Sequence, residues 1–235
     1  MKTYISILAF FIFGIASGQA QHIAFGAKGG LLVGVGTQQG KRALLSYHGD
    51  LFFETMGKWQ GDNVARRLGM VIQLGYHRRG TSYNTGYFNN VNFIASDLFH
   101  NISLATLLKG NFKLGNFLPY YGVGVRLDIT PSSQVINTLD AQGVTPVNFG
   151  FWLGGGIEWE PPKLPFGLFL ELSINPDITP QIFFPKGTQV QYIQPFSTAT
   201  TTRSFTEDYK IINISLEVTL GIKFLIRKKQ EPTEQ

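Results

Sequence analysis

The feature that most constrains the fold of this chain is the alternation of apolar and polar side chains near its C-terminus. Apolar residues occupy every second position from Ile212 to Phe224, and polar residues or glycine fill the positions between them, from Asn213 to Lys223. Successive side chains of a β-strand point to opposite faces, so this pattern predicts a strand with one apolar and one polar face. Its length suits a tilted membrane-spanning strand of roughly 9–11 residues better than a soluble strand of about 5–6.

The same alternation recurs seven more times along the chain. The segments lie near residues 22–36, 45–56, 67–77, 101–113, 121–129, 148–159 and 166–175. The connections between them alternate between short and long, and the longest are 78–99, 130–146 and 176–208. Short turns on one side and long loops on the other are typical of outer-membrane barrels. The sequence therefore predicts an all-β fold, an eight-stranded antiparallel up-and-down transmembrane β-barrel with both chain ends in the periplasm.

The first twenty residues predict a secretory signal peptide. Lys2 is followed by the apolar run from Ile5 to Ile15 and by small residues up to Ala20, a pattern typical of export and cleavage. We expect a signal peptide over 1–20, cleavage near Ala20, the barrel over 21–226, and a polar periplasmic tail over 227–235. The chain has no cysteine, which excludes disulfides, thiolate metal sites and a lipoprotein anchor.

Alternation does not by itself decide which face meets solvent, because a soluble, exported lipocalin-like ligand binder alternates too. Charged residues make up only 15% of the chain, against about 25% in soluble domains. The polar face is rich in glycine, which relieves crowding inside a narrow barrel. Aromatic residues on the apolar face near the predicted periplasmic ends resemble an interfacial girdle. These are Phe25, Tyr121, Trp159, Phe166 and Phe224. We therefore expect the apolar face to lie outside.

The polar face carries acidic and basic residues in equal number. They are Lys28, Arg67, Lys109, Lys113, Arg126 and Lys223 with Asp50, Glu54, Asp128, Glu158, Glu171 and Glu217. An unpaired buried charge is costly, so we predict that they form a paired network that fills the lumen. The alternative is that they are ordinary solvated surface charges.

The sequence contains no familiar catalytic motif, and we therefore expect no enzyme, no cofactor and no metal. The chain has no phosphate-binding loop, zinc-protease helix or nucleophile elbow. The enzyme alternative is an outer-leaflet lipid-modifying barrel, which needs a serine and a histidine on the lipid-facing side near the outer rim. His100 faces outward there, but its same-face neighbour is Ile102. His48 lies with Asp50 on the inner face, where ion pairing or hydrogen bonding explains it. The basic residues are scattered, so no nucleic acid is expected.

The long connection 176–208 carries apolar residues at Phe183, Phe184, Tyr192 and Phe196. Apolar residues in an exposed loop mark a partner site, or they fold down and cap the barrel; the sequence leaves both open. We predict a non-catalytic barrel that acts through its extracellular loops or as a component of an envelope or secretion assembly. The expected partners are outer-membrane lipid and an envelope protein.

Two segments carry a family resemblance. The first is the entry from Phe25 to Gly30, and the second is the closing run from Thr219 to Ile226. Together they resemble the outer-membrane β-barrel domain family that includes the PorT-like proteins, and more loosely the OmpX-like small barrels. In the closing run, Thr219, Gly221, Phe224 and Ile226 look like the signal read by the barrel-assembly machinery, although the chain does not end on an aromatic residue. The resemblance implies a bacterial outer-membrane location and that machinery as a partner.

Overall fold

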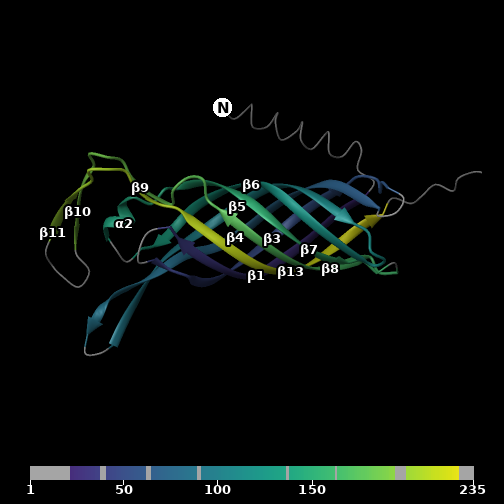
Figure 1. The fold of residues 1–235 in the computed structure, drawn as a ribbon, viewed down its shortest axis with the longest axis horizontal. Helices are drawn as coiled ribbons and strands as arrows, with labels where there is room; N and C mark the ends of the chain where they lie inside the picture. The colour runs from purple at the N-terminus through teal and green to yellow at the C-terminus, as the bar shows by residue number, and fades with distance from the viewer. Residues whose placement is uncertain are drawn as a thin grey trace, which may run out of the picture.

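Eight long strands close into one antiparallel barrel in the computed structural model, which describes residues 22–37, 41–61, 65–88, 91–135, 138–161, 163–193 and 200–227. The strands are β1 (His22–Gly36), β3 (Leu44–Met56), β4 (Arg66–Phe88), β5 (Val91–Phe112), β6 (Phe117–Gln134), β7 (Val147–Trp159), β8 (Phe166–Pro176) and β13 (Asn213–Arg227). Each pairs with its sequence neighbour in the barrel, and β1 pairs with β13 to close the ring (Figure 1). The predicted fold class is confirmed. The predicted signal peptide and the tail beyond Arg227 lie outside the described residues.

The outer surface of the barrel is apolar. Leu51 of β3, Leu68 of β4 and Leu220 of β13 are each about two-thirds exposed, at 65%, 68% and 67%. Leucine, valine, isoleucine and aromatic side chains from the other barrel strands are exposed on the same face. A soluble protein rarely exposes an apolar surface of this extent, whereas a bilayer requires one. The apolar face therefore lies outside, and the lipocalin-like arrangement does not apply.

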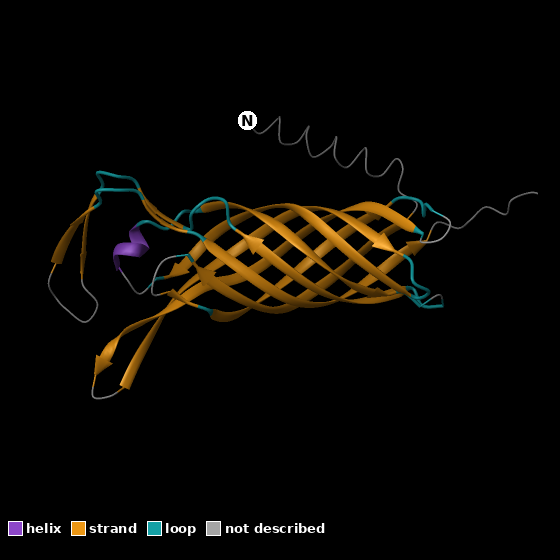
Figure 2. Cartoon of the chain, viewed as in Figure 1, coloured by secondary structure: helices purple, strands orange, loops and turns teal. Residues whose placement is uncertain are grey.

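The two ends of the barrel differ. At one end the strands are joined by short connections, and the paired termini His22 and Arg227 lie there. We call this the short-turn end. At the other end, β4 and β5 continue beyond their neighbours as a long hairpin (Figure 2). The prediction of a loop over 78–99 is therefore wrong. This stretch lacks a clear apolar face, but its backbone pairs nearly without interruption, with Arg79 opposite Phe99 and Thr81 opposite Asp97.

Most of the remaining elements form a small cap at the same end as the long hairpin. They are α2 (Thr138–Gln142), β9 (Ile182–Phe184), β10 (Gln189–Ile193), β11 (Thr200–Ser204) and β12 (Tyr209–Ile211). The two-residue strand β2 (Lys41–Arg42) instead pairs with β4 and belongs to the barrel sheet. The expected loop over 176–208 is thus largely ordered: β9 pairs with β12, and β10 pairs with β11. None of the helical segments in the described part has the length and apolar character needed to span a bilayer.

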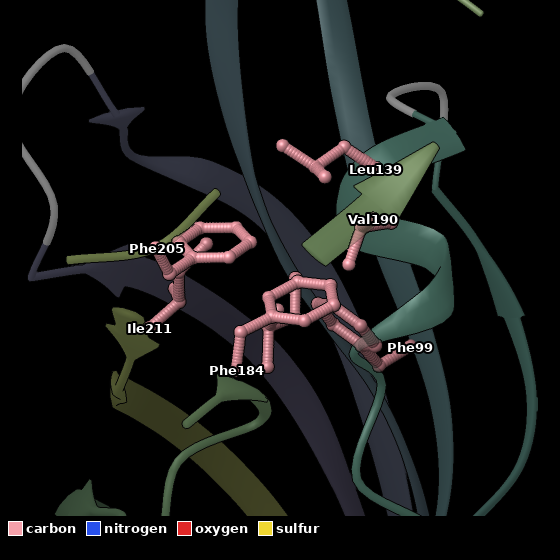
Figure 3. Close-up of a cluster of buried hydrophobic side chains, with 7 residues drawn as sticks. Phe99, Leu139, Phe184, Val190, Phe205 and Ile211 are labelled. Atoms are coloured by element: carbon pink, nitrogen blue, oxygen red, sulfur yellow. The ribbon is translucent and has the colours of Figure 1, made fainter. Parts of the chain in front are cut away.

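An apolar core holds the cap together (Figure 3). Its buried members are Phe99, Leu139, Ile182, Phe184, Val190, Phe205 and Ile211. The rings of Phe184 and Phe205 stack with centroids 4.8 Å apart. Because Phe99 belongs to β5, this core joins the cap to the barrel wall. We refer to the described residues of 135–145 and 178–212 as the cap.

Candidate functional site

The lumen at the short-turn end is filled by a balanced group of ion pairs, which we call the short-turn charge cluster. Its members are Arg67, Lys109, Lys223, Glu54, Glu158 and Glu160. The Nζ atom of Lys223 lies 2.6 Å from both Glu158 and Glu160 and 3.4 Å from Glu54. Lys109 donates to Glu54 at 2.5 Å and also contacts Glu158. Three cations thus face three carboxylates, so no charge in this set lacks a partner.

Glu160 lies just beyond the end of β7, at the edge of this cluster. Burial alone would raise the pKa of its carboxyl, but Lys223 and Arg67 outweigh that effect and hold the pKa below its ordinary value. Glu160 was not expected in the lumen, because it lies in a turn where period two gives no side-chain direction.

An apolar layer crosses the middle of the lumen. It consists of Phe52, Val71, Ala105, Leu107, Trp152 and Phe169. Phe169 meets Phe52 edge-to-face at a centroid distance of 5.6 Å, and a Cβ atom on Gly221 would lie only 2.1 Å from Cζ of Phe169. Glycine on the inner face therefore makes room for an aromatic ring. The layer borders a small cavity with room for about one water molecule.

A salt bridge and a tyrosine line the same cavity. The Nζ atom of Lys28 lies 2.5 Å from Oε1 of Glu171. The hydroxyl of Tyr120 donates to Oε2 of the same carboxylate at 2.9 Å. Both oxygens of Glu171 are therefore satisfied, and the lumen is packed with side chains rather than open.

The lumen at the other end holds an unbalanced group, the cap-end charge cluster. Its members are Arg79, Arg126, Asp50, Asp128, Asp177, Glu217, His48 and His77. Arg79 and Arg126 each lie 2.8 Å from Asp128, and Arg126 also contacts Asp177. Four carboxylates thus face two guanidinium groups, so acidic side chains outnumber the arginines in this cluster.

Asp177 lies just past the end of β8 and shows the effect of this imbalance. Burial, together with the nearby Asp128, raises its pKa to about 6 although Arg79 and Arg126 act in the opposite direction. A carboxyl with this pKa gains a proton more readily than an exposed aspartate, which is expected where acids outnumber their cationic partners.

One carboxylate bridges the two histidines of this cluster. Asp50 Oδ2 lies 3.0 Å from Nδ1 of His48, and Asp50 Oδ1 lies 2.9 Å from Nε2 of His77. The two imidazole rings stack with centroids 5.1 Å apart. The β3–β4 register places His48 opposite His77, which explains the stacking. Sequence reasoning paired His48 with Asp50, but it did not find His77, because register between strands is not visible in a single strand.

Of the twelve residues predicted to form the lumen network, eleven are buried on the inner face. Lys113 is the exception and the prediction for it is wrong. Strand β5 ends at Phe112, so the alternation no longer directs the next side chain inward. Lys113 is exposed, and its Nζ atom lies 5.9 Å from the ring centre of Trp59.

The four residues of the predicted assembly signal divide between the two faces of β13. Thr219 is fully buried, and its hydroxyl lies 3.0 Å from Nε2 of His48. Gly221 lies beneath the ring of Phe169. Phe224 and Ile226 face outward and are about half exposed. Recognition of these residues by assembly machinery stays a prediction.

The lipid-facing surface carries a polar pair that sequence reasoning missed. The hydroxyl of Tyr76 lies 2.5 Å from Nδ1 of His100. Tyr47 lies beside Tyr76 at a centroid distance of 6.3 Å, and the guanidinium of Arg78 lies 5.8 Å from the ring centre of Tyr47. A same-strand search for a serine near His100 could not find Tyr76, because β4 supplies it from across the sheet.

The apolar residues expected to bind a partner have different environments. Phe184 is buried in the core of the cap, and Tyr192 packs against that core. Phe183 points away from it, is 36% exposed, and lies 5.7 Å from Nζ of Lys210. Phe196 lies outside the described residues. The described part of this connection therefore forms a cap and leaves one aromatic side chain on its surface.

These observations define the class of protein: a closed β-barrel of the outer-membrane type, with an apolar outer surface and a filled lumen. No family model and no curated protein matches the chain. Among solved structures it is similar to the outer membrane protease OmpT from Escherichia coli, with 10% identity, 88% of this chain and 97% of that chain covered, and a TM-score of 0.37. It is also similar to the translocator domain of autotransporter NalP from Neisseria meningitidis, with 10% identity, coverages of 94% and 95%, and a TM-score of 0.28.

The comparison with OmpT corrects one prediction. A chain of this fold without a familiar catalytic motif was expected not to be an enzyme, but a protease is among the barrels that it resembles. That expectation is therefore withdrawn. At 10% identity the resemblance concerns the fold and assigns no activity to this chain. The finer resemblance to PorT-like proteins has no family match and stays a prediction.

Proposed function

We propose that this protein is an integral outer-membrane barrel with a closed lumen, and that it acts through its cap by binding a partner outside the cell. The observation that carries this proposal is the cap itself. A connection expected to be a loop has its own apolar core, anchored to β5 through Phe99. Ordering a connection of this length costs conformational entropy, and long ordered loops at the rim of a barrel are where binding sites are found.

The filled lumen supports the closed state. Two layers of ion-paired side chains enclose an apolar layer, and the interior of an eight-stranded barrel is only wide enough for side chains. An aqueous path would have to break buried salt bridges, which is costly. The chain is therefore not proposed as a diffusion channel.

Removing the cap hairpin while keeping the barrel tests the proposal. The variant replaces residues 189–204, which include β10 and β11, by a short Gly-Ser linker in the full chain. We expect heat-dependent migration on SDS gels as in the wild type, because the hairpin contributes nothing to the barrel ladder. We expect loss of complementation in a strain that lacks the gene.

A single substitution on the surface of the cap tests where the partner binds. Phe183→Ser removes the exposed aromatic side chain beside Lys210 without entering the core of the cap. We expect it to weaken complementation while the cap stays resistant to protease. Full complementation by the hairpin deletion would contradict the proposal.

One observation favours a second function, the modification of outer-leaflet lipid. Tyr76 and His100 form a short hydrogen bond on the lipid-facing surface, and a hydroxyl beside a base is the arrangement that activates a nucleophile. The test is incubation of the refolded barrel with mixed micelles of lipopolysaccharide and phospholipid, followed by mass spectrometry of the lipids. The expected result is a change in acylation that is lost in Tyr76→Phe and in His100→Ala. Unchanged lipids with the wild-type protein would exclude this function.

A further inference from the structure

We propose that His48, Asp50 and His77 form a binding site for a first-row divalent transition metal ion such as Zn²⁺ inside the barrel. Nothing in the proposed function requires this site. Each of the three side chains is at least nine-tenths buried, and each offers one ligand atom, with all three atoms within 4.8 Å of one another. Two imidazoles and one carboxylate are the ligand types that zinc and its neighbours in the first row bind.

The spacing of the three ligand atoms fits such an ion. The Asp50 oxygens lie 3.0 Å from Nδ1 of His48 and 2.9 Å from Nε2 of His77. Ligand atoms at about 2.0–2.2 Å from a tetrahedral ion lie roughly 3.3–3.6 Å apart. One ligand atom from each of the three side chains already lies within 4.8 Å of the others, so small shifts of the two rings and the carboxylate bring them to that spacing. Three protein ligands leave a fourth tetrahedral position for water or an added ligand.

The backbone of β3 and β4 holds these ligands together. The register places His48 opposite His77 and Asp50 opposite Gly75. A Cβ atom on Gly75 would lie 1.9 Å from Oδ1 of Asp50. The glycine therefore leaves the space in which the carboxylate reaches both imidazoles, and a side chain there would displace it.

The opposite nitrogen of each imidazole also faces the groups that a metal-bound histidine needs. Nε2 of His48 lies 3.0 Å from the Thr219 hydroxyl and 4.0 Å from Glu217. Nδ1 of His77 lies 3.4 Å from the same Glu217 carboxylate. Ligating histidines usually donate their other N–H to a carboxylate or a similar acceptor, which orients the ring. Glu217 is placed to accept from His77 in this way, and Thr219 from His48.

Arg79 is the group whose present position is least favourable for metal binding. Its Nη2 lies 3.2 Å from Nδ1 of His77, so it competes with Glu217 for that nitrogen. Its other terminal nitrogen is held by Asp128 at 2.8 Å, and Nη2 itself lies 3.6 Å from Glu217. A small rotation of the guanidinium toward Glu217 therefore frees Nδ1 without breaking the ion pair with Asp128.

The charge balance of the lumen also favours a bound cation at this site. The cap-end charge cluster has four carboxylates and two guanidinium groups, whereas the short-turn charge cluster has three of each sign. A buried excess of negative charge is unfavourable. One divalent cation between His48 and His77 restores neutrality.

The test loads the metal during refolding, since the buried ligands are reached most easily before the barrel closes. The mature chain is refolded from urea into detergent with excess Zn²⁺ at neutral pH, desalted, and analysed for metal by mass spectrometry and X-ray absorption. The expected result is about one tightly held zinc ion per folded chain, with nitrogen and oxygen neighbours at about 2.0–2.2 Å. His77→Gln should reduce retention at least about tenfold, the usual scale for a lost ligand or its support.

His22→Gln is the matched control, because it removes a histidine near the short-turn end and leaves the site intact. It should retain zinc like the wild type. If His77→Gln does not fold, the absorption spectrum of the wild type decides by itself. A folded wild-type barrel that retains no zinc overturns the proposal. Zinc retained equally in His77→Gln, or without nitrogen neighbours, overturns it as well.

Discussion

Loss of one buried lysine should destabilise the barrel more than any surface change of the same chemistry. Lys223 is completely buried and lies within 2.6 Å of Glu158 and Glu160 and 3.4 Å of Glu54. Lys223→Met keeps most of the volume but leaves three carboxylates facing two cations. Removing one partner of a buried ion pair costs about 3–5 kcal/mol, because the remaining charge stays buried without compensation.

The assay is equilibrium unfolding of the full barrel in urea, in detergent, followed by tryptophan fluorescence and by migration on unheated SDS gels. Lys223→Met should lower the free energy of unfolding by about 3–5 kcal/mol. Lys223→Met combined with Glu158→Gln restores the charge balance and should recover a large part of this loss. The surface pair of Lys210 and Asp208, 3.2 Å apart and half exposed, provides the control. Lys210→Met should change stability by less than about 1 kcal/mol.

Two results would refute the reasoning about the lumen. If Lys223→Met is as stable as the wild type, the carboxylates of the short-turn charge cluster are hydrated or protonated, and the lumen is not packed as the ion pairs indicate. If the double variant is less stable than either single variant, charge balance does not govern this layer. The hydrogen bonds that Asn111 and Lys109 donate to Glu158 would then dominate the stability of this layer.

The remaining predictions concern packing, pH and the cap. Gly221→Ala should destabilise the barrel by about 1–3 kcal/mol through overpacking against Phe169, and Gly221→Ala with Phe169→Leu should relieve it; equal gel-shift temperatures for Gly221→Ala and wild type would contradict this. Burial raises the pKa of Asp177 to about 6, so the folded state binds this proton more tightly than the unfolded state, and the Asp177 contribution to stability falls as pH rises from about 4 to about 6. Asp177→Asn should remove that part of the pH dependence, and an unchanged unfolding profile over that range would argue against it. Phe184→Ala should cost about 3–5 kcal/mol locally, so that protease cuts the cap while the barrel still migrates as a folded species; simultaneous loss of both would show that cap and barrel unfold as one unit.

The local pattern of the sequence determined the strands and their faces. The direction of a side chain along a strand depends only on its position in the pleat, so alternation around residues such as Lys28 and Glu217 was sufficient to place them inside. Low charge content and long strands then decided between lipid and water on the outer face. Eight segments of this kind can satisfy their backbone groups in a membrane only as a closed barrel.

Only the tertiary structure decided which inward residues meet. The partners of Asp50 come from its own strand and from β4, and those of Glu158 come from β5 and β13. Such contacts depend on register and on closure of the ring, and neither is encoded in the period of one strand. The same reason explains why His77 and the Tyr76–His100 pair were not found from the sequence.

The ends of the strands could not be predicted from the alternation either. Alternation stops being informative where both faces become polar or where a turn begins, so Lys113 was placed inside by mistake and Arg79 was left in a loop. The cap was undecided because its apolar residues lack a period, and its core forms only when Phe99, Leu139 and Phe184 from separate segments pack together. Side-chain direction is a local property of the strand, whereas pairing in the lumen and burial in the cap are properties of the closed fold.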